Sequence, residues 1–372
     1  MNKTTQPGNK VSKDKPKKRV LFLTPYPYDT APGQRFRYEQ YLNILNEHGI
    51  EYHLDSFLDD STWTVLYKKG FLLKKAWGIF WGFIRRLFIL PSVAQYDYVF
   101  IFREASPIGP PVFEWFISKV LRKKIIYDFD DAIWLPNTSD SNQIVSGIKW
   151  HSKVGSICRW SYKISCGNAY LADYARQFNR SVIVNPTTID TVNYHNRIKD
   201  QHTPTLTIGW TGTHSTIQYL DIILPILQKL EKQFDFTFIV ISNAPPAFKL
   251  KSLEYIHWSK DTEIDDLLRF NIGIMPLTDD AWAKGKCGFK ALQYMSLGIP
   301  ALVSPVGVNT TIVDNGINGI ICHNAEEWER AITTLTTDRE LNVRMGKLAR
   351  KKIEDKYSVI SNSANFIGLF QS

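Results

Sequence analysis

Continuous apolar runs alternate along the chain with stretches in which apolar residues recur every three or four positions. Residues 19–24 (RVLFLT) form such a run, typical of a parallel strand buried on both faces. The loop after it leads to residues 35–49, where tyrosine and leucine recur at helical spacing before Gly49. The first fifty residues therefore predict a strand, a loop and a helix in that order.

The same unit recurs through both halves of the chain. In the first half we expect further strands at 51–54, 98–102, 124–127 and 162–166, and helices at 112–121 and 169–178. The second half restarts at Leu206, with apolar runs at 236–242, 255–258, 272–277, 300–305 and 319–323, and helices at 289–297 and from 325. This alternation predicts an α/β fold of two Rossmann-like domains that face each other across a cleft.

Composition and polarity suggest the domain boundaries. We expect a disordered basic tail (1–18), an N-terminal domain for the acceptor (19–196), a C-terminal domain for the donor (204–355), and a last helix (356–372) that packs back on the N-terminal domain.

The 372 residues include 11 Trp and 21 Phe, too many for a disordered chain. The four cysteines show no metal-ligand spacing, which favours reduced cytosolic thiols.

The net charge of +9 is concentrated in two short segments. Residues 1–19 and residues 68–86 each carry a net charge of +6, so the rest of the chain carries −3. A basic face spread over the fold is therefore not expected, which argues against nucleic acid as a partner.

The second basic segment, 68–91, has the pattern of an amphipathic helix. Its longest uncharged run, 76–84, is too short to cross a bilayer. At helical spacing one stripe carries Leu73, Trp77, Phe80, Trp81, Ile84 and Phe88, with Lys74 and Arg85 beside it and Lys68, Lys75 and Arg86 opposite. We expect this helix to lie on an anionic membrane surface, the inner face of the cytoplasmic membrane, through Leu73, Trp77, Trp81, Arg85 and Arg86. The alternative is a core helix with a charged rim.

Residues 283–309 (AKGKCGFKALQYMSLGIPALVSPVGVN) resemble the donor motif of retaining sugar-nucleotide glycosyltransferases with the GT-B fold, of the glycosyl transferases group 1 type. That family has two glutamates eight residues apart, followed by a small-Gly-x-Pro turn. Residues 297–300 (LGIP) match the turn, whereas Gly285 and Gln293 stand at the glutamate positions. Segments 166–171, 185–190 and 315–319 also resemble family motifs.

The resemblance implies transfer of a sugar, with retention, from a nucleotide sugar to a glycan or lipid-linked acceptor in surface polysaccharide or lipopolysaccharide synthesis. The two missing glutamates leave open an inactive nucleotide-sugar-binding scaffold. A sugar-nucleotide epimerase of the same architecture is a further alternative.

Transfer from a nucleotide sugar releases a diphosphate, whose charge an enzyme without a metal must hold with backbone N–H groups and cations. No cofactor is expected, and a metal is not required. The donor site is predicted at Gly212, Thr213, His214, Lys286, Lys290, Gln293 and Gly307. A tight turn capped by Ser215 and solvated surface lysines are the structural alternatives.

The acidic segment 128–131 (DFDD) follows a predicted strand. We assign Asp130 and Asp131 as catalytic residues that polarise and deprotonate an acceptor hydroxyl. A metal-binding Asp-x-Asp pair and a cap by Asp131 on the following turn are the alternatives.

Four residues at the ends of the first and third predicted strands are candidates to bind the acceptor: Gly33, Arg35, Arg37 and Arg103. The alternative for the arginines is an ordinary interdomain salt bridge. The sequence contains no GxSxG motif, which argues against a hydrolase.

Overall fold

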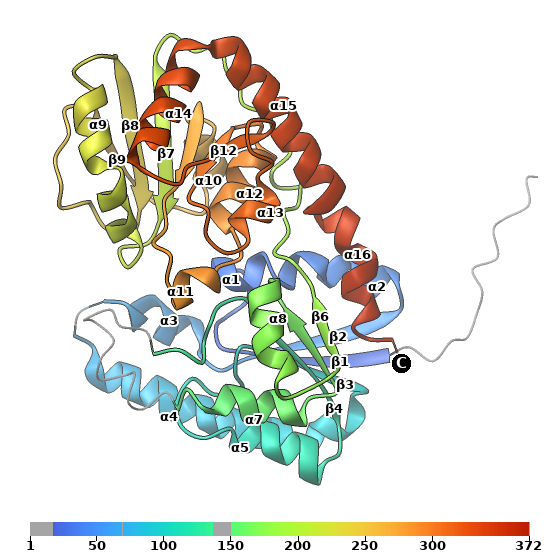
Figure 1. The fold of residues 1–372 in the computed structure, drawn as a ribbon. Coiled ribbons are helices and arrows are strands. Elements are labelled where there is room, and N and C mark those ends of the chain that lie inside the picture. Colours follow the sequence, from blue (N-terminus) through green and yellow to red (C-terminus); the bar gives the residue numbers. More distant parts are fainter. Residues whose placement is uncertain (1–17, 69, 137–149, 372) are drawn as a thin grey trace, which may run out of the picture.

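The computed structural model describes residues 18–68, 70–136 and 150–371, and they form two six-stranded sheets whose neighbouring strands are all parallel (Figure 1). The N-terminal sheet has the order β2-β1-β3-β4-β5-β6. Its strands are β1 (Lys18–Thr24), β2 (Ile50–Ser56), β3 (Tyr98–Phe102), β4 (Lys124–Phe129), β5 (Lys163–Cys166) and β6 (Val182–Val184). The C-terminal sheet has the order β12-β11-β10-β7-β8-β9. Its strands are β7 (Leu206–Gly212), β8 (Phe236–Ser242), β9 (Leu253–His257), β10 (Ile272–Met275), β11 (Ala301–Val303) and β12 (Gly319–Ile321). The predicted fold class, two Rossmann-like α/β domains, is confirmed.

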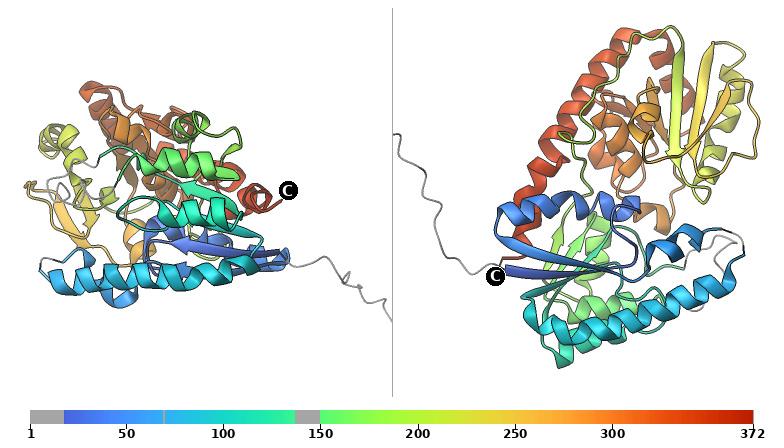
Figure 2. Two further views of the ribbon diagram at one scale, coloured as in Figure 1. Left: turned by 90° about the horizontal axis from the view of Figure 1, so that it is seen from below. Right: turned by 180° about the vertical axis from the view of Figure 1, so that it is seen from behind.

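The N-terminal domain carries helices on both faces of its sheet (Figure 2). They are α1 (Pro32–Arg35), η1 (Glu39–Tyr41), α2 (Leu42–Glu47), α3 (Asp60–Leu66), α4 (Leu72–Ile89), η2 (Leu90–Gln95), α5 (Val112–Trp115), η3 (Phe116–Val120), α7 (Lys153–Trp160) and α8 (Ala169–Arg176). The helix predicted at 35–49 is therefore three short pieces. The break comes at Tyr38, whose φ of −129° is not helical and which turns inward together with its neighbour Arg37.

The helices of the C-terminal half surround the second sheet. They are η5 (Ile217–Ile222), α9 (Leu224–Leu230), α10 (Glu263–Leu267), α11 (Ala281–Lys284), α12 (Phe289–Ser296), α13 (Asn309–Ile312), α14 (Ala325–Thr337), α15 (Arg339–Lys356) and α16 (Val359–Gly368).

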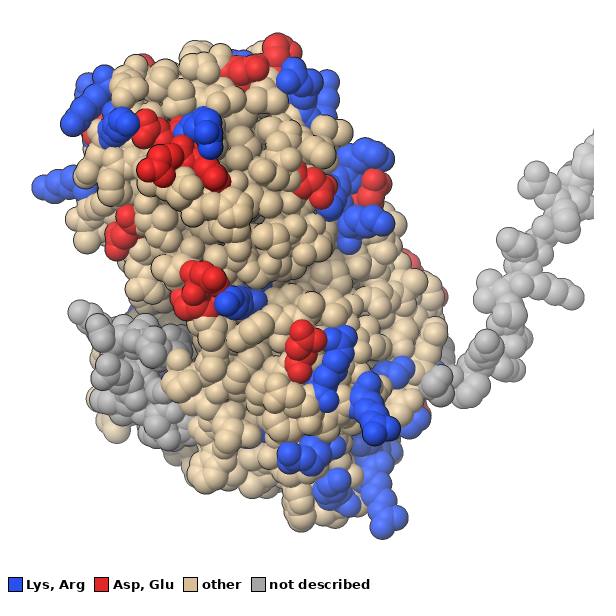
Figure 3. All heavy atoms as spheres, viewed as in Figure 1, with Lys and Arg blue, Asp and Glu red and all other residues tan. Residues whose placement is uncertain are grey.

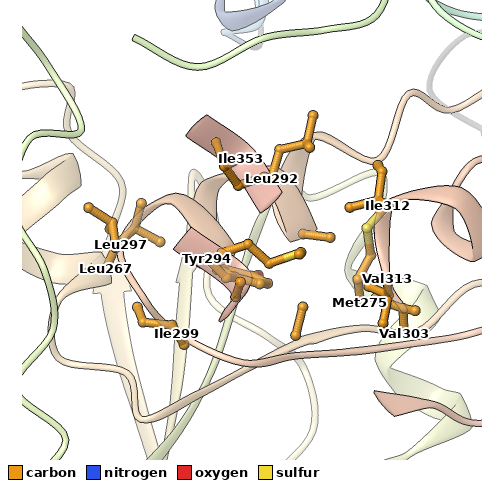
Figure 4. Packing of buried hydrophobic residues seen from close by; sticks show 14 of the residues in the cluster. Leu267, Met275, Leu292, Tyr294, Leu297, Ile299, Val303, Ile312, Val313 and Ile353 are labelled. Carbon is orange, nitrogen blue, oxygen red and sulfur yellow. The ribbon is translucent and has the colours of Figure 1, made fainter. Parts of the chain in front are cut away.

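Helix α12 lies in the core between the sheet and α15, with Leu292 close to Ile353 (Figure 4). Tyr294 packs over β10 at Gly273, where a Cβ atom would lie only 2.2 Å from the tyrosine ring. Its hydroxyl accepts a hydrogen bond of 3.0 Å from the N–H of Thr211 on β7. These contacts hold α12 rigidly against the carboxyl end of β7.

The last helix returns to the N-terminal domain. Helix α15 runs along the C-terminal domain, and α16 continues beside the first sheet (Figures 1 and 2). The rings of Phe366 on α16 and Tyr41 stack with centroids 4.3 Å apart. The N–H of Val359 also donates to the carbonyl of Ile189, at 3.0 Å. Residues 1–17 of the predicted tail lie outside the described residues, whereas Lys18 already belongs to β1.

Candidate active site in the interdomain cleft

The loop at 284–287 brings the two domains into direct contact. The amide nitrogen of Asn168, which follows β5, donates to the carbonyls of Gly285 and Lys286, each at 3.1 Å. The same side chain caps α8 by accepting from the N–H of Leu171. The thiol of Cys287 donates to the carbonyl of Asp130 at 3.1 Å. The carboxyl ends of β4 and β5 therefore meet the segment that precedes α12.

This contact explains why residue 285 is glycine. A Cβ atom there would lie 2.7 Å from the Cβ of Ala132, in the loop directly after Asp131. Any side chain would push the two domains apart at this point. A glutamate at position 285, as in the resembled motif, is incompatible with this arrangement.

The predicted catalytic aspartates form one ionic cluster with Arg103. The Arg103 guanidinium donates from Nε to Asp130 at 2.8 Å and from Nη2 to Asp131 at 2.7 Å. All three residues are half-buried. Gly33 closes the cluster, since a Cβ atom there would be 3.5 Å from both Arg103 and Asp130. Four of the residues predicted for catalysis and acceptor binding are thus brought together.

Arg103 itself has a left-handed backbone, with φ of 60°. That conformation costs a non-glycine residue on the order of 1 kcal/mol and persists only where its surroundings enforce it. Here the N–H of Arg103 donates to the carbonyl of Asp128, and its own carbonyl accepts from the hydroxyl of Tyr127, both at 2.7 Å. These two hydrogen bonds fix the backbone so that the guanidinium lies at the carboxyl end of β4, next to Asp130 and Asp131.

Burial raises the pKa of Asp130, against the opposing effect of Arg103, and the neighbouring Asp131 raises it further. A carboxylate with a raised pKa is a stronger base than an exposed one. The carboxylate of Asp131 accepts from Arg103 rather than capping the next turn. The cluster therefore has the composition expected of a general base and its positioning cation.

Arg37 does not belong to the cleft surface, which corrects its assignment to the acceptor site. It is only 2% exposed and pairs with Asp128 at 2.5 Å, while also donating to the carbonyl of Asn185. Asp128 also accepts from Ser165 at 2.5 Å.

Because Asp128 and Asp130 bind different arginines, the two carboxylates do not form the metal-binding pair considered from the sequence. Among the residues described, no three His, Cys, Asp or Glu side chains are grouped to hold a metal ion.

Arg35 forms an interdomain ion pair, the alternative that the sequence left open. Its Nη2 lies 3.3 Å from the carboxylate of Glu263 on α10, in the other domain. Tyr194 donates to the same Glu263 oxygen at 2.8 Å. Arg35 also lies 3.6 Å from Asp29, which pairs in turn with Lys260 of the C-terminal domain. Arg35 thus links the domains, and its assignment to acceptor binding is corrected.

Gln293 joins the same interdomain network. Its amide donates to Glu263 at 3.3 Å, and the side chain is 2% exposed. Gln293 therefore faces the domain contact, and its assignment to donor binding stays a prediction. Sequence reasoning missed Glu263 altogether, because an acidic residue at the start of a short helix usually serves the helix alone.

Two half-buried lysines of the predicted donor site lie near the domain contact, and no described carboxylate forms an ion pair with either. The Lys290 ammonium lies over the ring of Trp210 at 5.5 Å, and that of Lys286 over Trp282 at 5.7 Å. Burial and the nearby Lys286 lower the pKa of Lys290 to about 7, whereas Asp131, in the opposite domain, raises it. Two half-buried cations side by side form a site that favours an anion.

The loop after β7 forms the adjacent wall. Gly212 packs on the Trp210 ring, where a Cβ atom would be 2.4 Å away. Thr213 and His214 are exposed, and the N–H of His214 donates to Asn243 at 2.8 Å. Gly307, with φ of 56°, approaches the carbonyl of Lys284. Ser215 does not cap the following helix, because its hydroxyl contacts Thr213 instead.

Helix α4 presents most of its predicted apolar stripe to solvent. It lies on the side of the N-terminal domain away from the C-terminal domain (Figures 1 and 2). Leu73 is 89% exposed and Trp77 64%, and Trp81 is also exposed. The helix packs inward through Gly78 and Gly82, where Cβ atoms would clash with Thr62 and Phe57.

The two arginines of α4 point inward, so their assignment to the membrane surface is corrected. Arg86 is fully buried, pairs with Asp55, and donates to the carbonyls of Thr24 and Ala105, each at 2.8 Å. Arg85 donates to the carbonyl of Phe57 at 2.5 Å. No described helix combines the length and apolarity needed to cross a bilayer.

Figure 3 shows numerous basic and few acidic side chains at the lower right of the N-terminal domain, whereas α4 is labelled at its lower left in the same view of Figure 1. In the printed sequence, residues 61–96, which include α4, contain six Lys or Arg and no Asp or Glu. Of these cations, Lys68 and Lys74 are exposed. The exposed face of α4 therefore combines apolar side chains with positive charge.

Comparisons with known proteins agree with this arrangement. Residues 205–338 match the family model described as glycosyl transferases group 1. No curated protein sequence matches the chain. Among solved structures, sucrose-phosphate synthase from Thermosynechococcus elongatus superposes with a TM-score of 0.66 at 10% identity, over 95% of this chain and 98% of that chain.

Two further structures have the same fold. Anabaena Alr3699/HepE in complex with UDP and glucose has a TM-score of 0.62 at 13% identity, over 95% of this chain and 99% of that one. The lipopolysaccharide outer core galactosyltransferase WaaB has a TM-score of 0.61 at 11% identity, over 95% and 99% of the two chains. These similarities show the shared two-domain architecture.

Proposed function

Residues 205–338 form a glycosyl transferases group 1 domain and the protein is a glycosyltransferase of the GT-B fold; from this premise we propose that it takes its sugar from a nucleotide-sugar donor bound at Lys286 and Lys290. The acceptor is a glycan or a lipid-linked saccharide of a cell-surface polysaccharide or lipopolysaccharide. Retention of configuration rests on the resemblance of residues 283–309 to the retaining enzymes.

The observation that carries the proposal is the pair of lysines, Lys286 and Lys290, neither of which forms an ion pair with a described carboxylate. Elsewhere in the described cleft the cations are matched by carboxylates, as Arg35 is by Glu263 and Arg103 by Asp130 and Asp131. A diphosphate at Lys286 and Lys290 would supply the missing negative charge and would restore the pKa of Lys290 toward its ordinary value. As the bond to the sugar breaks, these cations would stabilise the charge that develops on the leaving diphosphate.

The acceptor would react on the opposite wall. The Asp130 carboxylate is half-buried, and burial raises its pKa, so it suits the removal of a proton from an acceptor hydroxyl. Arg103 holds Asp130 and Asp131 in place through two hydrogen bonds. Asp130 is therefore our proposed base, and Arg103 a positioning residue.

The enzyme is proposed to work at the inner face of the cytoplasmic membrane. The support is the exposed stripe of Leu73, Trp77 and Trp81 on α4, in a segment rich in cations and free of acids. Exposed tryptophan and leucine beside lysine favour the interface of an anionic bilayer. The bilayer contact would lie on the side of the N-terminal domain away from the donor domain.

A catalytically inactive scaffold is the second candidate, favoured by Gly285 and Gln293. The first lacks a side chain and the second is bound to Glu263 in the domain contact. A scaffold would bind the donor but leave it intact.

A thermal-shift screen of UDP-, GDP- and ADP-sugars tests the donor assignment. A ligand at about 100 times its Kd should add roughly 2.7 kcal/mol to the unfolding free energy. The double variant Lys286→Ala/Lys290→Ala should lose this stabilisation, whereas Lys284→Ala, whose lysine pairs with Asp279, should keep it. Slow hydrolysis of the bound sugar without acceptor distinguishes the enzyme from the scaffold. A screen without any hit would overturn the proposal.

A further inference from the structure

The segment 284–287, which contains Lys286, is held by a side chain of the opposite domain. The carbonyl oxygens of residues 284, 285 and 286 lie 3.4, 3.1 and 3.1 Å from the amide nitrogen of Asn168. Asn168 belongs to the N-terminal domain and is 3% exposed. A side-chain amide has two N–H groups to donate, and this one finds acceptors for both in the same segment. The backbone conformation around Lys286 therefore depends on a residue outside its own domain.

The next residue, Cys287, is buried against the N-terminal domain although it belongs to the C-terminal one. Its side chain is 9% exposed and is part of the hydrophobic cluster of the first sheet that contains Cys166. Its thiol donates to the carbonyl of Asp130 at 3.1 Å. Gly167 leaves room for the sulfur, because a Cβ atom there would collide with it. Separating the two domains would therefore expose Cys287 and leave the Asn168 amide without these acceptors.

Asn168 uses the two polar atoms of its side chain for two different tasks. Its Oδ1 accepts from the N–H of Leu171 at 2.9 Å and caps α8, which leaves the amide nitrogen to face the segment 284–287. Aspartate caps a helix about as well as asparagine does, but its carboxylate has no N–H to donate and would face carbonyl oxygens of like partial charge. The substitution Asn168→Asp therefore removes the interdomain hydrogen bonds and retains the cap.

The two lysines of the donor site differ in how they are held. Lys290 lies on α12, which Tyr294 anchors to β7 of the same domain. The backbone of Lys286 lies in the segment bound by Asn168, and its ammonium lies 5.7 Å from the centre of the Trp282 ring. Lys286 also lowers the pKa of Lys290, so the two ammonium groups are close enough to act on one anion. Of the two, Lys286 should be the one displaced when the domain contact opens.

We infer that Asn168 is a positioning residue that couples the donor site to the domain contact: it holds Lys286 where a diphosphate can bind while the domains touch, and releases it when they separate. This inference rests on the proposed function for the role of the two lysines. It deepens that function by naming the residue of the opposite domain on which donor affinity depends. Because Asn168 acts through Lys286, its effect should vanish when the Lys286 ammonium is absent.

Labelling of Cys287 tests the domain contact with no ligand present. In Asn168→Asp, N-ethylmaleimide should modify Cys287 about tenfold faster than in the wild type, as expected when two interdomain hydrogen bonds are lost. Mass spectrometry of the labelled peptides assigns the rate to this thiol. Cys322, buried in the core of the second sheet, is the internal reference and should react as in the wild type.

Asn324→Asp is the matched control, because Asn324 is an exposed cap that accepts from the N–H of Glu327 at the start of α14. It should leave the labelling of Cys287 unchanged. Urea unfolding should be nearly unchanged in both variants, because each retains its cap. If Asn168 served only as a cap, Asn168→Asp would behave like this control.

Inorganic pyrophosphate is the probe for the donor site, because it carries the charge of a diphosphate and needs neither base nor sugar. By calorimetry, Asn168→Asp should weaken pyrophosphate binding about fivefold in the otherwise wild-type protein and cause no further loss in Lys286→Ala. In Lys290→Ala a loss of the same size should persist, because Lys290 is not held by the domain contact.

Gly285→Ala disturbs the same contact from the other side, because its Cβ atom would lie 2.7 Å from that of Ala132. It should also speed the labelling of Cys287 and weaken pyrophosphate binding. Unchanged labelling in both variants would overturn the positioning role of Asn168. Faster labelling with unchanged pyrophosphate affinity would overturn the coupling to Lys286. A wild-type protein that binds no pyrophosphate would overturn the donor assignment, and the coupling with it, whatever the labelling shows.

Discussion

The two walls of the cleft use their cations in opposite ways. On the N-terminal side Arg103 is bound by carboxylates of its own domain and Arg35 by Glu263 across the domain contact, while Arg37, buried behind that surface, is bound by Asp128. On the C-terminal side Lys286 and Lys290 lie over tryptophan rings, and no described carboxylate forms an ion pair with either. A paired cation positions protein groups, whereas an unpaired, half-buried one is prepared for an anionic ligand. The comparison teaches that basic residues near a cleft indicate a phosphate site only where no acid already neutralises them.

The largest expected effect separates chemistry from binding on the N-terminal wall. Asp130→Asn should slow sugar transfer by about 10²–10⁴-fold, the usual contribution of a general base, and leave donor affinity nearly unchanged. Initial rates and calorimetry on one preparation measure both quantities. Asp173→Asn, at an exposed ion pair on α8, is the control. Full turnover in Asp130→Asn would move the base elsewhere, with Asp131 the next candidate.

Replacing a paired cation should lower the stability of the fold. Arg37→Met leaves Asp128 buried without its partner, so the unfolding free energy should fall by about 3–5 kcal/mol in urea titrations. Arg37→Met/Asp128→Leu should recover much of that loss, because no charge remains unpaired. If Arg37→Met instead kept full stability and lost only acceptor affinity, Arg37 would return to the acceptor site.

Replacing an unpaired cation should weaken the binding of the nucleotide-sugar donor. Lys290→Ala should weaken the donor by roughly 1.5–3 kcal/mol, the cost of losing a charged hydrogen bond, with little change in stability. Because burial lowers the pKa of Lys290 to about 7, most of the free protein loses this charge above that pH. Binding must then take up a proton, so affinity should fall by up to about tenfold per pH unit above pH 7.

Lys290→Arg is the control for that pH dependence, because arginine stays protonated throughout. Its donor affinity should be almost independent of pH between about 7 and 9. A wild-type affinity that does not change over this range would contradict the role of Lys290.

The smallest expected effect concerns α4, where exposed cations accompany apolar side chains. Trp77→Ala/Trp81→Ala should lower partitioning onto anionic phosphatidylglycerol vesicles by about tenfold, or about 1.4 kcal/mol, in co-sedimentation. High salt should weaken wild-type binding further. Trp115→Ala, an exposed tryptophan on α5, should change nothing. Equal binding by all these proteins would exclude α4 as the membrane contact.

Local pattern was sufficient for the elements themselves. The apolar runs at 98–102 and 236–242 coincide with β3 and β8, because a strand buried on both faces must be apolar throughout. The exposed stripe of Leu73, Trp77 and Trp81 was also predictable, since helical spacing places them together wherever the helix lies. The strand β6 was missed: it has three residues at a sheet edge and none of them is buried, whereas β12, equally short and also at an edge, begins with a buried residue.

The roles of the charged residues were decided by the tertiary structure. Arg35 and Arg37 are two positions apart in sequence, yet their partners are Glu263 and Asp128 in different domains. The sequence predicted a membrane contact for Arg85 and Arg86, but in the folded protein both side chains donate to backbone carbonyls. The sequence thus specifies where apolar surface is buried, because that depends on local periodicity. Which cation stays free depends on distances between residues far apart in the chain, since the energy of an ion pair and the cost of burying a charge are set by the folded surroundings.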